Sequence, residues 1–187
     1  MRINETFASL QGEGRFTGTP VYFLRLSGCN LQCSFCDTQH HTFTEMTEDE
    51  VVREACQQGL RHMLITGGEP ALQLTQTFVD KLHEAGFFIQ VETNGTLPLP
   101  EGIDWVTCSP KGEPVLERVD ELKVLYQGAE TDLSVAERIT AKEYRLQPLD
   151  TGNDMQNRII LRDTIAYIMQ HPKWSLSLQT HKMLGIR

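Results

Sequence analysis

Three cysteines lie close together in the chain, at positions 29, 33 and 36, with the spacing C-x3-C-x2-C. Clustered thiols of this kind indicate a metal site more readily than a disulfide framework. A cubane iron–sulfur cluster has four irons and is usually held by four thiolates, so three cysteines would leave one iron open to a small molecule. The motif therefore suggests a cluster that does chemistry rather than one that only stores electrons.

Zinc is the alternative metal, because thiolates suit it and His40 or His41 stands near enough in the sequence to supply a fourth ligand. Structural zinc sites usually add a second, distant pair of ligands, whereas Cys56 and Cys108 stand alone. Lone cysteines are mostly small buried hydrophobic residues, and we expect that role for both. Spacing favours the cluster and leaves zinc open.

Length and charge restrict the class of protein. The 187 residues correspond to one domain, residues 1–187, which is short for a complete βα barrel of roughly 250 residues. The net charge of −8 comes without a basic stripe, so we expect no nucleic-acid partner. Residues 1–9 lack the apolar core of a secretory signal and no apolar run reaches membrane-spanning length, so we expect no membrane and a cytoplasmic location.

Short apolar or alternating runs predict strands at residues 21–26, 62–66, 87–91, 105–108, 121–125, 144–147 and 174–178. A capping box of Thr47 and Glu50 predicts a helix that ends near Gly59, and further helices are expected over residues 73–85 and 155–169. Alternating strands and helices indicate a mainly parallel sheet, but the later strands have few helices to cover them. The expected fold is α/β: a partial, shortened βα barrel of about six mainly parallel strands with few helices.

Segments of unusual composition follow several of these strands. They are the cysteine loop, residues 66–70 with the sequence Thr-Gly-Gly-Glu-Pro, residues 109–111 and residues 147–150. Ligands of such sheets bind beyond the carboxyl ends of the strands, so we expect these segments to converge there. Gly67 and Gly68 would let the backbone approach a ligand, although a tight turn also explains them. Residues 10–14, before the first predicted strand, are either part of this site or a flexible loop.

Arg25 lies inside an otherwise apolar run and must find an anion or reach solvent. A substrate carboxylate and an internal ion pair are equally good explanations. Asp37 and Thr38 offer the oxygen ligands that magnesium takes, but capping or turn roles are the more ordinary ones. For His181 and Lys182, a solvated tail near the C-terminus is a sufficient explanation.

The cysteine motif, Phe35 before the third cysteine and the Gly-Gly-Glu-Pro run together resemble the radical S-adenosylmethionine superfamily. Further motifs extend the resemblance along the chain to one family within it, the 7-carboxy-7-deazaguanine synthases. These motifs cover residues 10–14, 16–18, 36–38, 92–95, 109–111, 147–150 and 179–182.

The resemblance implies a [4Fe-4S] cluster on Cys29, Cys33 and Cys36, with S-adenosylmethionine chelating the fourth iron. Its one-electron cleavage would give a radical that takes hydrogen from C6 of 6-carboxy-5,6,7,8-tetrahydropterin. The ring then contracts, ammonia is lost and 7-carboxy-7-deazaguanine forms, a precursor in queuosine or other 7-deazapurine biosynthesis. The resemblance names no catalytic acid or base on the chain, because the cofactor supplies the radical and the protein supplies position.

The resemblance also assigns binding roles. By similarity, the residues that contact S-adenosylmethionine are Phe35, Cys36, Asp37, Gly68, Ser109, Pro110, Lys111, Gln147, Pro148, Leu149 and Asp150. Those that contact the pterin are Leu10, Gln11, Gly12, Arg25, Thr66 and, through the chain terminus, Arg187. Thr38 would hold the Mg2+ ion.

Partners implied by the resemblance are the small-molecule pterin, a flavodoxin or ferredoxin as electron donor and a second copy of the chain in a homodimer. Two other functions stay open from the sequence. One is an activase that installs a glycyl radical on another protein, and the other is a non-catalytic metal-binding module with zinc in place of iron.

Overall fold

The computed structural model describes residues 1–33, 36 and 42–187. The strands of this part are β1 (Arg2–Leu10), β2 (Pro20–Leu26), β3 (Thr44–Glu45), β4 (His62–Gly67), β5 (Phe88–Thr93), β6 (Trp105–Cys108), β7 (Arg118–Tyr126), β8 (Thr140–Pro148) and β9 (Trp174–Leu176). The helices are α1 (Glu48–Gln57), the short 3-10 helix η1 (Pro70–Leu72), α2 (Gln76–Glu84), α3 (Val135–Arg138), α4 (Asp154–Gln170) and α5 (Thr180–Leu184).

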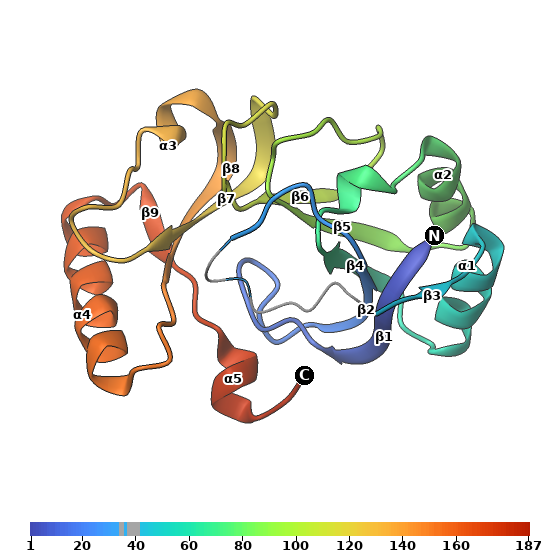
Figure 1. Ribbon diagram of the computed structural model, residues 1–187, viewed down its shortest axis with the longest axis horizontal. Coiled ribbons are helices and arrows are strands. Elements are labelled where there is room, and N and C mark those ends of the chain that lie inside the picture. The colour runs from blue at the N-terminus through green and yellow to red at the C-terminus, as the bar shows by residue number, and fades with distance from the viewer. Residues whose placement is uncertain (34–35, 37–41) are drawn as a thin grey trace.

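The described strands form one sheet in the order β3-β1-β2-β4-β5-β6-β7-β8-β9. Strands β2 and β4 to β9 are parallel, whereas β1 is antiparallel to both of its neighbours. The sheet curves into an arc that stays open, with α1 and α2 outside one end and α4 outside the other (Figure 1). The predicted α/β fold, a partial barrel with mainly parallel strands and few helices, is confirmed.

The sequence patterns missed β1 and β3. Residues 2–10 mix polar and apolar side chains and showed no strand alternation, yet they pair along the whole of β2. The run at residues 21–26 is therefore the second strand, and the prediction that it comes first was wrong. Pairing with a buried neighbour satisfies the backbone of β1 whatever its side-chain pattern, which is why the pattern did not reveal it.

Helix starts follow local capping chemistry. Thr47 and Glu50 form the predicted capping box, with the Thr47 Oγ1 accepting from the Glu50 amide at 3.2 Å and Glu50 Oε2 accepting from the Thr47 amide at 2.7 Å. The helix predicted over residues 73–85 begins later, at Gln76, because Thr75 caps the Phe78 amide at 3.0 Å. Residues 73–75 lie outside this helix, between it and η1.

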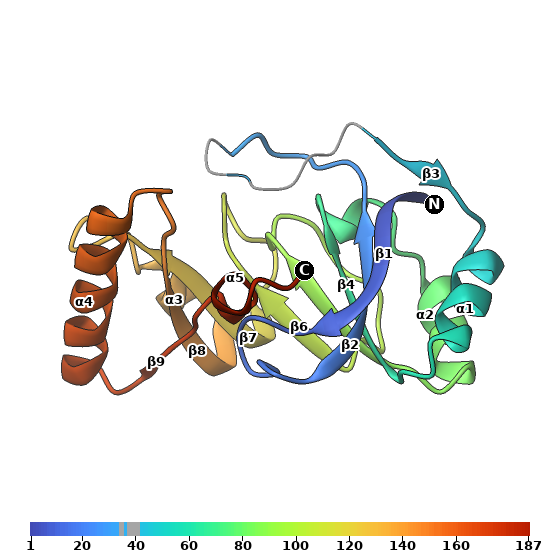
Figure 2. The same ribbon diagram turned by 90° about the horizontal axis from the view of Figure 1, so that it is seen from below.

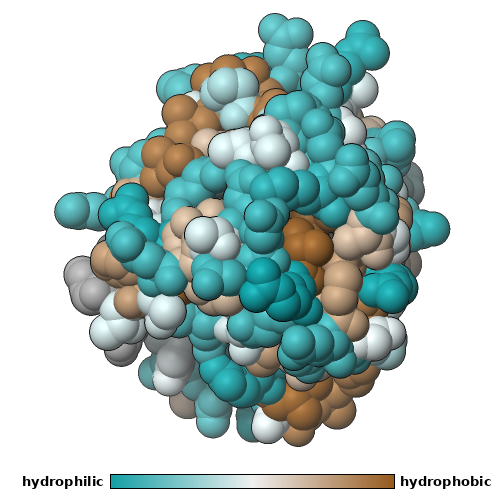
Figure 3. All heavy atoms as spheres, turned by 90° about the vertical axis from the view of Figure 1, so that its right-hand side faces the viewer, coloured by the Kyte–Doolittle hydropathy of each residue, from teal (hydrophilic) through white to brown (hydrophobic). Residues whose placement is uncertain are grey.

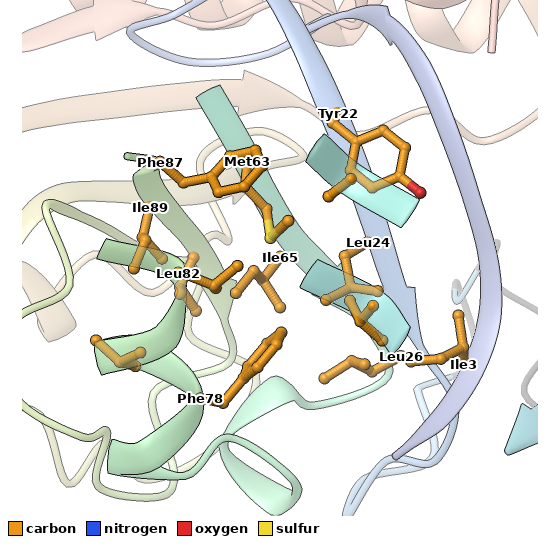
Figure 4. Close-up of a cluster of buried hydrophobic side chains, with 14 residues drawn as sticks. Ile3, Tyr22, Leu24, Leu26, Met63, Ile65, Phe78, Leu82, Phe87 and Ile89 are labelled. Carbon is orange, nitrogen blue, oxygen red and sulfur yellow. The ribbon is translucent and has the colours of Figure 1, made fainter. Parts of the chain in front are cut away.

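The main hydrophobic core lies between the first half of the sheet and helices α1 and α2 (Figure 4). Leu24, Met63 and Ile89 of neighbouring parallel strands meet Phe78 and Leu82 of α2, and all five are fully buried. Burial of apolar area of this kind is the main term that holds a helix against a sheet. A second core forms around β7, β8 and β9, with side chains of α4 packed against it.

The outer face that carries α1 and α2 is mostly hydrophilic, with hydrophobic side chains in separate places (Figure 3). None of the helices in the described part of the chain has the length and apolar character that crossing a membrane requires. Residues 27–33, which follow β2, lie on the side of the molecule to which the carboxyl ends of the parallel strands point (Figure 2). Cys29 and Cys33 are therefore at this end of the sheet.

Two glycines let the loops after β2 and β4 touch backbone to backbone. The Gly68 amide donates to the Leu26 carbonyl at 3.0 Å, and the Glu69 amide donates to the Gly28 carbonyl at 2.9 Å. A Cβ on Gly68 would overlap the Gly28 carbonyl, and one on Gly67, whose φ is 122°, would overlap the Leu26 backbone. Only glycine allows this approach.

Gly68→Ala is expected to lower the free energy of unfolding by about 1–3 kcal/mol, because backbone atoms must move to admit the methyl group. Urea denaturation measured by circular dichroism checks this. The control is Gly112→Ala, whose Cβ would lie at an ordinary 3.5 Å from Thr96 Cγ2 and should change stability by less than about 0.5 kcal/mol. Equal stability of the two variants would contradict the packing argument.

Candidate functional site

A cavity of about 590 Å³ opens at the carboxyl ends of the parallel strands. Its walls come from the β1–β2 loop, the cysteine segment, the ends of β2, β4 and β5, the segments after β6 and β8, the middle of β7, and α5. This volume is within the usual range for small-molecule sites. The four segments expected to converge at this edge of the sheet all contribute to it.

Cys29, Cys33 and Cys36 all line this cavity and are free thiols. The Leu31 amide donates to Cys29 Sγ at 3.4 Å, and the Cys36 amide donates to the Cys33 carbonyl at 3.2 Å. Burial raises the pKa of the Cys29 thiol, so a metal must displace its proton.

The donor set fits an iron–sulfur cluster. It consists of three cysteines that line the same cavity. The Leu31 amide already donates to Cys29 Sγ, and hydrogen bonds to sulfur are common around such clusters. Among the described residues, no three Cys, His, Asp or Glu side chains surround a single point where one metal ion would sit. A cube of four irons instead takes its thiolates at separate corners.

The other two cysteines differ from each other. Cys108 is fully buried at the end of β6, as predicted, and burial raises its pKa to about 12. Cys56 is exposed on α1, so the prediction that it is buried was wrong. The sequence pattern assigned Cys56 to the same helix face as Ala55. In the structure Ala55 is buried, whereas Cys56 lies on the exposed side of α1.

Glu69 is buried and fixes the loop that carries it. Its carboxylate accepts from Thr93 Oγ1 at 2.7 Å, from the Asn94 amide at 2.7 Å and from the Ala71 amide at 3.0 Å. Glu69 is not among the residues that line the cavity. Its role in this structure is to join the loop after β4 to the end of β5, while Gly67 and Gly68 face the cavity.

Most of the residues assigned to S-adenosylmethionine line the cavity. Those that line it are Cys36, Gly68, Ser109, Lys111, Gln147, Leu149 and Asp150, whereas Pro110 and Pro148 are not among its lining residues. Lys111 Nζ donates to Ser109 Oγ at 2.9 Å. Burial lowers the pKa of Lys111.

The residues assigned to the pterin line the same cavity. They are Leu10, Gln11, Gly12, Arg25, Thr66 and Arg187. Arg25 Nε donates to Glu5 Oε1 at 2.9 Å across the β1–β2 pair, and Arg187 pairs with the other oxygen of Glu5. The internal ion pair that the sequence left open for Arg25 is therefore present, and Arg25 also faces the cavity.

Some predictions fall outside the described residues. They concern Phe35 and Asp37 as S-adenosylmethionine contacts, Thr38 as a Mg2+ ligand, and His40 and His41 as alternative zinc ligands. These assignments stay predictions.

Sequence reasoning missed a buried charge cluster on the cavity wall. Lys123 of β7 bonds to Glu13 Oε2 at 2.7 Å and to Glu92 Oε2 at 2.9 Å, and all three residues line the cavity. A lysine between the apolar residues of a predicted strand was the available signal. His181 and Lys182 also line the cavity, so the solvated-tail explanation was wrong.

Comparison with known proteins agrees with this site. The profile of the Radical SAM superfamily matches residues 24–124. The chain is 51% identical to 7-carboxy-7-deazaguanine synthase of Bacteroides thetaiotaomicron, over 100% of this chain and 98% of the relative. It is 37% identical to the protein of that name from Bradyrhizobium diazoefficiens, over 99% of this chain and 98% of the relative.

The fold agrees as well. The crystal structure of QueE from Escherichia coli matches with a TM-score of 0.78 and 31% identity, over 95% of this chain and 93% of that chain. Sequence similarity thus extends over the whole chain, and the structural match covers nearly all of it. The chain belongs to the 7-carboxy-7-deazaguanine synthase family of the radical S-adenosylmethionine superfamily.

Proposed function

We propose that this chain converts 6-carboxy-5,6,7,8-tetrahydropterin to 7-carboxy-7-deazaguanine with loss of ammonia, as a carbon–nitrogen lyase of the radical S-adenosylmethionine type. The observation that carries the proposal is one cavity whose lining includes the three cysteines together with Arg25 and Gln11. Similarity along the whole chain to relatives of this name supports it.

The cofactors are a [4Fe-4S] cluster and S-adenosylmethionine, which together supply the radical that takes a hydrogen atom. The protein's share is to place the reacting carbon within reach and to keep water away. We assign the pterin side to residues 10–12, Arg25, Thr66 and Arg187, and the cofactor side to residues 109–111 and 147–150. The presence of most of these residues in the lining of one cavity supports the assignment.

Several parts of the proposal rest on the family resemblance. They are a Mg2+ ion on Thr38, a flavodoxin or ferredoxin electron donor, a homodimer, and a product that feeds queuosine or another 7-deazapurine pathway. The continuous sheet supports one radical S-adenosylmethionine domain over residues 1–187. The cytoplasmic location stays a prediction from cysteine usage.

Reduced, cluster-loaded protein given S-adenosylmethionine and the carboxytetrahydropterin is expected to form 7-carboxy-7-deazaguanine, detected by mass spectrometry, in amounts that exceed the S-adenosylmethionine consumed. Cofactor cleavage without this product would favour the glycyl-radical activase instead. A colourless protein that holds zinc, without iron or sulfide, would favour the non-catalytic module. Either result would overturn the proposal.

Cys33→Ala is expected to lose the cluster and all turnover, because the site then has too few thiolates to hold the irons. Cys56→Ala is the matched control, since Cys56 is exposed on α1 and outside the cavity. Iron and sulfide content after anaerobic reconstitution measures both. The same iron loss in the two variants would refute the ligand assignment.

Arg25→Ala is expected to raise KM for the pterin by roughly 30-fold or more, which corresponds to ~2 kcal/mol for a partly buried charged contact. The loss of Arg25 also leaves Glu5 with only Arg187 of the two arginines that pair with it. Arg138→Ala is the control, because Arg138 pairs with the exposed Glu113 on the surface. An unchanged KM in Arg25→Ala would limit Arg25 to its ion pair with Glu5.

A further inference from the structure

The cavity wall contains one lysine between two carboxylates. The Lys123 side chain is only 5% exposed, compared with 20% for Glu13 and 16% for Glu92. Glu13 comes from the β1–β2 loop, Glu92 from β5 and Lys123 from β7, so the contact joins three separate segments. A buried lysine in such a position cannot be exchanged for an apolar residue without leaving like charges together.

The two carboxylates differ in their protonation. Burial alone would raise the pKa of Glu13, but the charge of Lys123 and hydrogen bonds from Lys123, Gln179 and Gln147 lower it to about 2. Burial raises the pKa of Glu92 to about 7 against the attraction of Lys123, and the charge of Glu13 adds to the rise. Burial alone would lower the pKa of Lys123, but the charges of Glu13 and Glu92 and the hydrogen bonds with them raise it, so the ammonium group stays charged.

Uncharged amide side chains also contact the two carboxylates of this cluster. Gln179 Nε2 donates to Glu13 Oε1 at 2.9 Å, while Gln11 and Gln90 approach Glu92 Oε1 at 3.5 Å. Glu121 of β7 and Lys111 after β6 are titratable side chains that also interact with the cluster, and His181 and Lys182 of α5 line the same cavity.

The ring that the proposed substrate presents carries several N–H donors on its aminopyrimidinone edge. An ionised carboxylate only accepts hydrogen bonds, whereas a protonated one also donates and would oppose such an edge. We propose that Lys123 is a positioning residue of the pterin site, which holds the carboxylates of Glu13 and Glu92 where they accept hydrogen bonds from the N–H groups of the substrate. This inference rests on the proposed function. It adds that Lys123 determines where the two carboxylates of the pterin site lie.

The test uses cluster-loaded enzyme with S-adenosylmethionine. It measures KM and kcat for the pterin, and binding of the fluorescent oxidised analogue 6-carboxypterin, between pH 5.5 and 8.5. Lys123→Met should weaken binding by roughly tenfold or more near neutral pH. Loss of the ammonium group raises the pKa of both carboxylates, so the pH at which binding fails in acid should move upward. KM should change more than kcat.

Two controls separate charge from fold. Lys123→Arg keeps the positive charge and should keep the pH dependence of binding, whatever small loss its bulk causes. Lys142→Met removes a lysine whose side chain is 72% exposed and should bind as the unchanged protein does. A loss in Lys123→Met that is the same at every pH, or no loss at all, would overturn the proposal.

A further variant covers the case in which Lys123→Met does not fold. Glu92→Gln has nearly the same shape and leaves Lys123 paired with Glu13. Because burial raises the pKa of Glu92 to about 7, the unchanged enzyme should bind the pterin more tightly as the pH rises through neutral. This change should disappear in Glu92→Gln, and its persistence would overturn the proposal. If the unchanged enzyme cleaves S-adenosylmethionine but never binds the pterin, the proposed function itself fails. If it binds the pterin and the variants behave as it does, only the role of Lys123 fails.

Discussion

The backbone contact between the loops after β2 and β4 fixes the start of the cysteine segment. The Glu69 amide bonds to the Gly28 carbonyl directly before Cys29, and glycine at position 68 is what allows the approach. Glu69 then uses its buried carboxylate to join the same loop to the end of β5. One wall of the cavity therefore depends on the absence of two side chains and the burial of a third.

Another part of the cavity lining depends on charge rather than on close packing. Lys123 links the β1–β2 loop to β5 and β7, and α5 is added through the Thr180 amide, which donates to the Gly12 carbonyl at 2.9 Å. An open barrel with few helices has no full ring of crossover connections to hold its interior segments. Here hydrogen bonds and ion pairs between distant segments hold the interior segments in place. The same polar groups line the cavity.

Local sequence patterns predicted most of the parallel strands, because an apolar run between turn residues has few other stable arrangements. They did not reveal β1, whose mixed residues become a strand only by pairing with β2. They left Arg25 between two explanations, since its partner Glu5 lies on the strand that was missed. The exposure of Cys56 was also misjudged, because the difference between adjacent helix positions depends on which face meets the sheet.

The sequence by itself determined the cysteine motif, the glycines after β4 and the parallel α/β architecture, because each depends on residue type and spacing along the chain. Only the tertiary structure decided that Glu13, Glu92 and Lys123 meet, and that the segment around His181 closes one side of the cavity. These residues are far apart in the sequence, and their contacts arise from the register and curvature of the sheet. No local pattern encodes those quantities.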